Sequence, residues 1–223
     1  MRIEILFIEL ITILITSCGT TKMLTSNIDP KKIDTLIFFK PISAIAYISK
    51  RNIAIYDSKL SKIAEDHVVD GIKEYFSDNI NIRTVRFDTV MQNRIDTVII
   101  SLINIVEKRG KINKIFVPET IDSIMIQMNV NYALCMFHSG FTRTSQNYSG
   151  QAEKVVALGL FTFVMLNNTV PFKATSNLWC CILDKKNNNI AFYRKNFRQN
   201  EPVDKRITDK QISKIFNKYF ERE

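Results

Sequence analysis

The sequence is poor in the residues and motifs from which most catalytic sites are built. Its 223 residues include only two histidines, His67 and His138, and neither belongs to a paired-histidine or His-x-Glu metal motif. A glycine-rich phosphate loop and a nucleophile elbow are also absent, which excludes the common nucleotide-dependent enzymes and serine hydrolases. The acids Asp96, Glu119 and Asp122 are better explained as helix-surface or helix-start charges. We therefore predict that the protein is not an enzyme, with no catalytic residues, no metal site and no cofactor.

Glycine and proline are scarce too, with 6 and 5 residues respectively. This composition excludes collagen-like chains and disordered chains of low complexity. Hydrophobic residues make up 46% and charged residues 24% of the sequence, which is the balance of an ordinary globular protein. The chain is long enough to bury one core and short for two domains of typical size. We expect a single folded domain over residues 32–223.

No apolar run approaches the roughly 20 residues that a membrane-spanning helix requires. The first such run, Ile5 to Ile15, is followed at once by Ile15-Thr16-Ser17-Cys18-Gly19. This pattern resembles the lipobox of bacterial lipoproteins, in which a diacylglycerol is attached to the cysteine and a peptidase cleaves before it. The resemblance implies a cleaved signal peptide over residues 1–17, a lipid on Cys18, and a lipidated tether over residues 18–31. The alternative is a buried N-terminal strand or helix with a chance cysteine.

The residues after Cys18 bear on the destination of the protein. Gly19-Thr20-Thr21-Lys22 contains no aspartate, and by the same resemblance this implies the periplasmic face of the outer membrane. Two or three acyl chains hold a protein on a membrane for long times, because each buried methylene contributes about 0.8 kcal/mol. The implied partner is therefore the membrane itself, through the lipid anchor.

The formal net charge is +9, which favours contact with polyanions. The basic residues, however, are scattered in ones and twos, and no nucleic-acid-binding module or basic helix is recognisable. We predict no nucleic-acid partner. The charge is explained either as solvated surface or as contact with lipid headgroups and cell-envelope polymers.

Cysteine is limited to four residues, and lipidation of Cys18 would leave Cys135, Cys180 and Cys181. An odd number is a poor disulfide framework. Cys180 and Cys181 are adjacent in an apolar run, so in a strand they point to opposite faces. They are interpreted as small buried hydrophobic residues, and a bridge from Cys135 to Cys180 or Cys181 is the open alternative.

Hydrophobic periodicity predicts an α/β fold, in which three to four helices flank a mixed sheet of about five strands. Tyr132 to Phe137 is apolar throughout, as in a central strand that is covered on both faces. A β-hairpin and a final helix, begun by the capping box Thr208-Asp209-Lys210-Gln211, are expected at the C-terminus. The other expected elements are strands at 33–40 and 80–87, a weaker apolar stretch at 42–48, hairpin strands at 178–183 and 190–197, a helix capped by Asp57, a helical stripe from Met91 to Val106 ending near Gly110, and a short helix led by Pro118.

This order of elements resembles a group of periplasmic lipoproteins whose α/β domain is similar to the N-terminal domain of TolB and to the curli-secretion lipoprotein CsgG. The resemblance implies a non-catalytic envelope protein that acts through assembly or a protein partner. We therefore expect a membrane-anchored interaction module of the cell envelope that binds a protein partner or self-associates. The alternative function is an envelope hydrolase whose site is not recognisable in the sequence.

A polar, turn-like segment from Thr142 to Gln151 leads into an apolar run of 12 residues, Val155 to Leu166. The run is too short to cross a bilayer as a helix and has no polar face. It is either buried core or a surface for membrane or partner contact. The contact residues predicted under the second interpretation are Val155, Leu158, Leu160, Phe161, Phe163 and Leu166.

Overall fold

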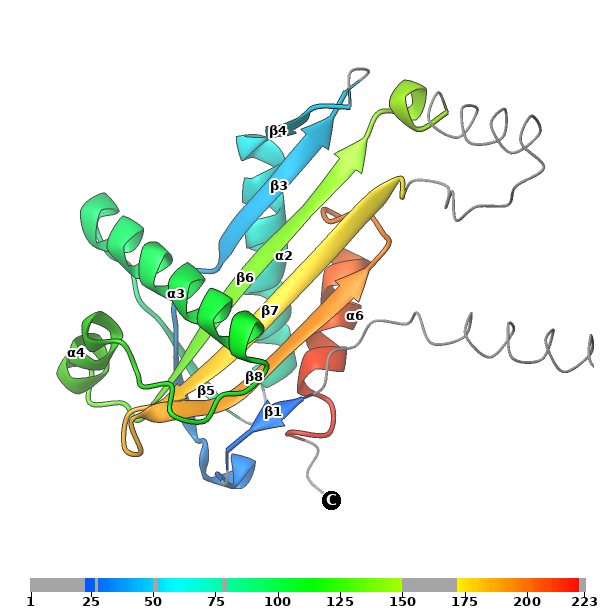
Figure 1. The fold of residues 1–223 in the computed structure, drawn as a ribbon. Coiled ribbons are helices and arrows are strands. Elements are labelled where there is room, and N and C mark those ends of the chain that lie inside the picture. Colours follow the sequence, from blue (N-terminus) through cyan, green and yellow to red (C-terminus); the bar gives the residue numbers. More distant parts are fainter. Residues whose placement is uncertain (1–22, 27, 50–51, 78–79, 150–171, 221–223) are drawn as a thin grey trace, which may run out of the picture.

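A mixed β-sheet forms the centre of the computed structural model, which describes residues 23–26, 28–49, 52–77, 80–149 and 172–220 (Figure 1). Within these residues the sheet has eight strands: β1 (Leu24–Thr25), β2 (Thr35–Phe38), β3 (Ile42–Ile48), β4 (Ala54–Tyr56), β5 (Asn81–Thr84), β6 (Tyr132–Arg143), β7 (Ala174–Asp184) and β8 (Asn189–Arg198). The helices are η1 (Pro30–Lys32), α2 (Ser58–Phe76), α3 (Thr89–Arg109), α4 (Glu119–Gln127) and α6 (Lys205–Phe216). Residues 145–149 are also helical.

The strand order is β1-β8-β7-β6-β2-β5, and the β3–β4 pair lies beside the second half of β6. β2 is parallel to β5 and to β6, β3 is parallel to β6, and the remaining pairs are antiparallel.

The predicted α/β class, mixed sheet and C-terminal hairpin with its helix are confirmed. The predicted count of about five strands is wrong. β1 and β4 are too short to show a two-residue period, and Pro41 separates β2 from β3.

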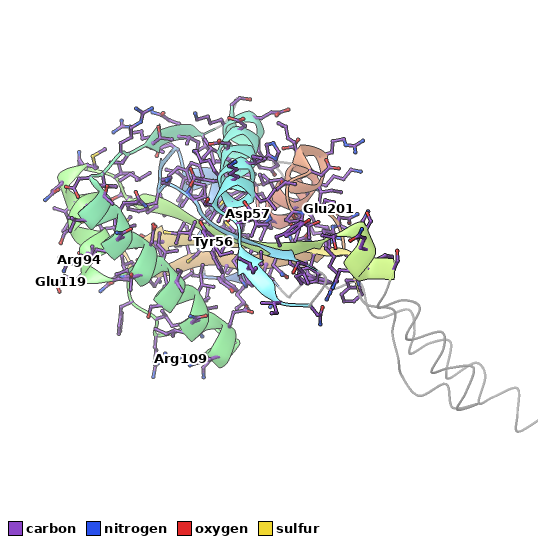
Figure 2. All side chains as sticks on the ribbon, turned by 90° about the horizontal axis from the view of Figure 1, so that it is seen from above. Tyr56, Asp57, Arg94, Arg109, Glu119 and Glu201 are labelled. Atoms are coloured by element: carbon purple, nitrogen blue, oxygen red, sulfur yellow. The ribbon has the colours of Figure 1, made fainter. Side chains whose placement is uncertain are left out.

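β6 is the central strand, as predicted for Tyr132 to Phe137. Ala133 to Met136 are fully or almost fully buried, because each face of the strand is covered by a different layer of helices. Residues of α2 and α6 form one core with Leu134 and Met136, and residues of α3 and α4 form the other with Ala133 and Cys135. Figure 2 shows these layers on opposite sides of the sheet.

Local capping signals determine where α2 begins and where α3 ends. The Asp57 carboxylate accepts hydrogen bonds from the backbone N–H groups of Lys59 and Leu60, at 2.9 and 3.0 Å, which satisfies donors that have no partner inside the helix. α3 ends at Gly110, which has φ of 61° in the left-handed region. Glycine adopts this conformation without steric cost. Both boundaries agree with the sequence-based expectation.

The predicted capping box at the last helix is wrong. α6 begins one turn earlier, with Asp204 as its N-cap, and the Asp204 carboxylate accepts a hydrogen bond from the Arg206 backbone N–H at 3.0 Å. Thr208 and Gln211 lie inside the helix and are fully buried. The pattern was misleading because Asp204 and Thr208 are both good capping residues, and packing of the helix onto the sheet decides between them.

Two segments expected to be irregular are partly ordered. β1, within the expected tether, pairs with β8 through Leu24 opposite Tyr193, so the described part of the tether lies on the sheet. Thr142 and Arg143, expected in a polar turn, continue β6, because they pair with β3 on one side and Thr142 also pairs with β7. Regular hydrogen bonding to both neighbours outweighs the turn propensity of this polar sequence.

Candidate functional site

The predicted lipidation site and contact segment cannot be placed in this fold. Cys18, the signal peptide and the six contact residues between Val155 and Leu166 lie outside the described residues. No helix in the described ranges is long and apolar enough to cross a membrane. Three other features of the described chain bear on function: a buried polar chain, an exposed apolar edge, and a charged crevice.

The cysteines are core residues, and the alternative of a disulfide is wrong. Cys135, Cys180 and Cys181 are all free and buried. Cys135 lies directly opposite Cys181 in the β6–β7 pair, whereas Cys180 belongs to the core on the other face. Side chains in a sheet stand roughly perpendicular to it, so the two opposed thiols extend side by side into the core. Burial raises the pKa of all three thiols, which suppresses the reactive thiolate.

A chain of buried polar side chains connects β6, β7 and α6. His138 Nε2 lies 2.8 Å from Ser176 Oγ, which donates its hydroxyl proton to Gln211 Oε1 at 2.7 Å. All three residues are fully buried. Because a serine hydroxyl has a single proton, His138 Nε2–H must be the donor to Ser176. A histidine that donates to a serine cannot act as its base, so this pair gives no support to the hydrolase alternative.

An exposed apolar surface lies at the edge of the sheet, on the β3–β4 hairpin. It consists of Tyr47, Ile53, Ile55 and Tyr56, whose exposed fractions are 38%, 55%, 58% and 63%. We call these four residues the edge surface. Among the described strands β4 pairs only with β3, so the outer side of β4 has no strand partner there. An apolar edge strand of this kind is a ready template for pairing with another chain.

Hydrogen bonds hold the hairpin in place from the end of β6. The Arg143 guanidinium donates to Asn52 Oδ1 and, at 2.7 Å, to Asn147 Oδ1. The Asn147 amide in turn donates to the Ser49 carbonyl at 2.6 Å. These contacts connect the tip of the hairpin to the strand beside it, so the edge surface is displayed on a fixed support.

The edge surface continues across one face of the sheet. In the strand register Tyr56 lies opposite Ala46, and Ala46 lies opposite Phe141, so the three side chains share a face. It is the face that carries α3 and α4, but these helices lie over the other end of the sheet (Figure 1). Ala46 and Phe141 are partly exposed. The apolar surface therefore extends from the edge strand toward β6, and Tyr56 is labelled on it in Figure 2.

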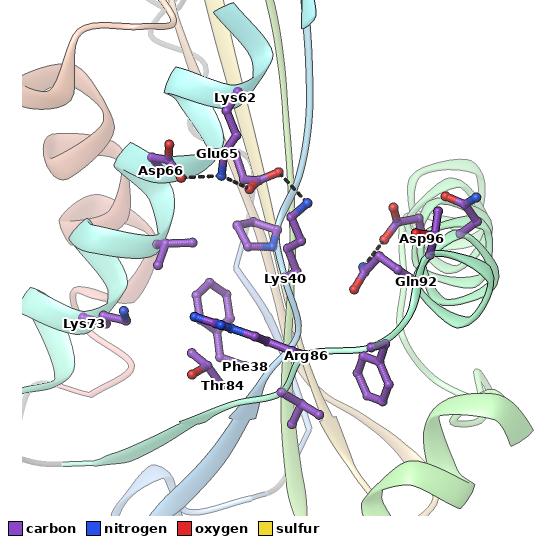
Figure 3. A pocket seen from close by; sticks show the side chains of 16 residues that line it. Phe38, Lys40, Lys62, Glu65, Asp66, Lys73, Thr84, Arg86, Gln92 and Asp96 are labelled. Carbon is purple, nitrogen blue, oxygen red and sulfur yellow. Dashed lines mark hydrogen bonds and ion pairs between the residues drawn. The ribbon is translucent and has the colours of Figure 1, made fainter. Parts of the chain in front are cut away.

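The crevice opens at the carboxyl ends of the parallel strands β2 and β5 and has a volume of about 580 Å³ (Figure 3). One wall is α2, the other is the first turns of α3, and Phe38 lies at the base. The Glu65 carboxylate pairs with Lys40 at 3.2 Å and with Lys62 at 2.8 Å. Lys62 also pairs with Asp66 at 2.7 Å. Four of the charges that line the crevice thus neutralise one another.

Asp96 was expected to be a charge on the helix surface, but it lies in the lining of the crevice. Its carboxylate lines the crevice and accepts a hydrogen bond from the Gln92 amide at 2.6 Å. Burial raises the pKa of Asp96 above its ordinary value. This environment could not be predicted from the sequence, because the residues around the crevice are spread from Phe38 to Asp96 and only the strand crossovers bring them together.

Comparison with known proteins identifies no family. No family model matches the chain, and no curated protein matches it. Several solved structures are distantly similar, among them the following three. A PelC dodecamer from Paraburkholderia phytofirmans is 9% identical with a TM-score of 0.42, covering 92% of this chain and 100% of that one. The C-terminal domain of LpoB from Salmonella enterica is 7% identical with a TM-score of 0.32, over 79% and 88%. A DUF4136 family protein from Bacteroides thetaiotaomicron is 6% identical with a TM-score of 0.33, over 88% and 94%. Similarity at this level does not bear on what the chain binds.

Proposed function

We propose that this protein is a lipid-anchored protein of the cell envelope whose α/β domain acts by binding protein, without catalysis. Cys18 would carry the lipid, and the outer membrane would be its location, on the strength of the lipobox-like sequence. The binding partner is another envelope protein or a second copy of the chain. The edge surface is the observation that carries the proposal.

The edge surface has the two properties that strand addition requires. Its outer strand, β4, pairs on one side only among the described strands, so an incoming strand would find backbone donors and acceptors. Side chains on both faces of the hairpin are apolar and more than a third exposed, including Tyr47 and Ile55 on one face and Tyr56 on the other. Contact with a partner would remove this apolar area from water, which is favourable by about 25 cal/mol per Å².

Site-specific crosslinking in cells tests the proposal. A photoreactive residue at Ile55 should give discrete crosslinked products in the membrane-bound, full-length protein. The matched control is Ile126 on α4, because its exposed fraction of 60% is close to the 58% of Ile55. Mass spectrometry of the products distinguishes a second copy from another envelope protein.

A second variant makes the test specific to the surface. Tyr56→Lys should abolish the crosslinks from position 55 and leave the melting temperature unchanged, since Tyr56 is 63% exposed. Equal crosslinking from positions 55 and 126, or crosslinks that persist in Tyr56→Lys, would contradict the proposed contact surface. Hydrolysis of an envelope polymer by the purified protein would contradict the non-catalytic function.

A further inference from the structure

The crevice has the position and size of a ligand site. β2 connects to β5 through the β3–β4 hairpin and then α2, which lies on one face of the sheet, and β5 leads directly into α3 on the opposite face. Where adjacent parallel strands connect to opposite faces, a crevice forms at their carboxyl ends, and this is where open α/β sheets bind ligands. A volume of about 580 Å³ matches sites for small organic molecules and exceeds what a single ion requires.

The groups that line the crevice carry an excess of positive charge, since four cations, Lys40, Lys62, Lys73 and Arg86, face three carboxylates, Glu65, Asp66 and Asp96. Lys40 and Lys62 are paired with Glu65 and Asp66. Lys73 from α2 and Arg86 from the segment after β5 also line the crevice, and neither makes an ion pair with an acid of the described residues. Figure 3 shows the Arg86 guanidinium extending toward Lys73, across Phe38 and Thr84. An anion bound between these two cations would be stabilised by both.

The remaining lining restricts the chemistry of that anion. A phosphomonoester carries between about 1.5 and 2 negative charges at neutral pH, so it can interact with Arg86 and Lys73 at the same time. The planar guanidinium of arginine binds phosphate oxygens in a bidentate manner, and the Thr84 hydroxyl lies beside it in the crevice. The opposite wall presents the amides of Gln92 and Asn93, which are suitable partners for hydroxyl groups.

We propose that the crevice binds a phosphomonoester of a polyol, with the phosphoryl group between Arg86 and Lys73 and the hydroxyl groups toward Gln92 and Asn93. A soluble polyol phosphate and a lipid headgroup that ends in a phosphomonoester share this chemistry. The site is separate from the edge surface and from Cys18, so the inference does not depend on the proposed function.

Calorimetric titration of the full-length protein in detergent, at low ionic strength, provides the test. Glycerol 3-phosphate should bind saturably and glycerol should not. Arg86→Gln and Lys73→Gln should each weaken binding about tenfold or more, since each removes a charge-assisted hydrogen bond. Both side chains are exposed, so the variants should retain the melting temperature of the parent protein. Lys111→Gln is the matched control, because Lys111 is exposed and follows the 21-residue α3 at the end away from the crevice.

Vesicles separate the two sources of the ligand. If the ligand is a headgroup, vesicles that contain phosphatidic acid should compete with glycerol 3-phosphate, and vesicles of phosphatidylglycerol, a diester, should compete less. If it is soluble, neither vesicle should compete. Absence of saturable binding to both glycerol 3-phosphate and phosphatidic acid would overturn the inference. Equal weakening by Lys111→Gln and Arg86→Gln would overturn it too, because it would indicate attraction to net charge alone.

Discussion

His138 is a neutral imidazole held inside the core. It lies between the sheet and α2, and burial lowers its pKa from 6.5 to about 4. The Nε2–H group has a partner in Ser176, whereas Nδ1 has no hydrogen-bond partner among the described residues. Protonation would place a second N–H and a positive charge in the buried interior, where the charge loses its hydration, which is unfavourable. The folded protein therefore binds this proton only at a lower pH than the unfolded chain does.

The stability of the protein should fall with acidification in a window set by His138. Between pH 6.5 and 4 the unfolded state binds more protons at this residue than the folded state, so the free energy of unfolding decreases as the pH falls. The loss should reach about 3 kcal/mol at pH 4. Urea denaturation of the parent protein and His138→Gln at pH 7 and pH 4 measures it. The stability difference between the two proteins should shrink by about that amount at pH 4, and a difference independent of pH would contradict the assignment.

At the scale of single elements, α6 shows which boundary signals can be read from sequence and which cannot. Asp57 predicted the start of α2, and Gly110 predicted the end of α3, because each residue acts through hydrogen bonds or dihedral angles within one turn. The Thr208 and Gln211 pair has the same local form, yet Gln211 points into the core. Its amide donates to the backbone carbonyls of Ser176 and Asn196, at 3.1 and 3.0 Å. These partners are more than ten residues away along the chain, so a local pattern contains no information about them.

This reassignment predicts unequal effects of two substitutions in α6. Gln211→Met should destabilise the protein by about 3 kcal/mol, because it leaves buried polar groups of β7 and β8 without partners. Thr208→Val should have a much smaller effect, because the Thr208 hydroxyl makes only a long hydrogen bond of 3.5 Å to the Asp204 carbonyl. Thermal and urea denaturation of both variants provide the measurement. A capping box would instead give comparable losses for the two substitutions.

At the scale of the whole molecule, the periodic elements were predictable, whereas the edge surface and the crevice were not. Long amphipathic helices and the apolar β6 carry their own signal. The edge surface depends on β4, a strand of three residues whose pairing with β3 makes Ile55 and Tyr56 part of an edge. The crevice depends on the crossovers that bring Phe38, Arg86 and Asp96 together. Both arise from long-range topology, which the order of elements along the chain does not specify.

The lipid anchor is the whole-molecule prediction on which the proposed location depends. Only a thiol at position 18 can accept the diacylglycerol, so Cys18→Ala should lose acyl labelling and move most of the protein from the membrane fraction to the soluble fraction. The apolar run before it, Ile5 to Ile15, is too short to hold the uncleaved chain across a bilayer stably. Cys135→Ala is the control, because Cys135 is buried and its loss should leave labelling and fractionation unchanged.

A Cys18→Ala protein that still carries lipid and still sediments with membranes would show that the N-terminal segment is not a lipoprotein signal. Loss of acyl labelling with retained membrane binding would instead locate the anchor elsewhere in the chain. The apolar run from Val155 to Leu166 is then the first candidate, and charges at Leu160 and Phe163 would release the protein.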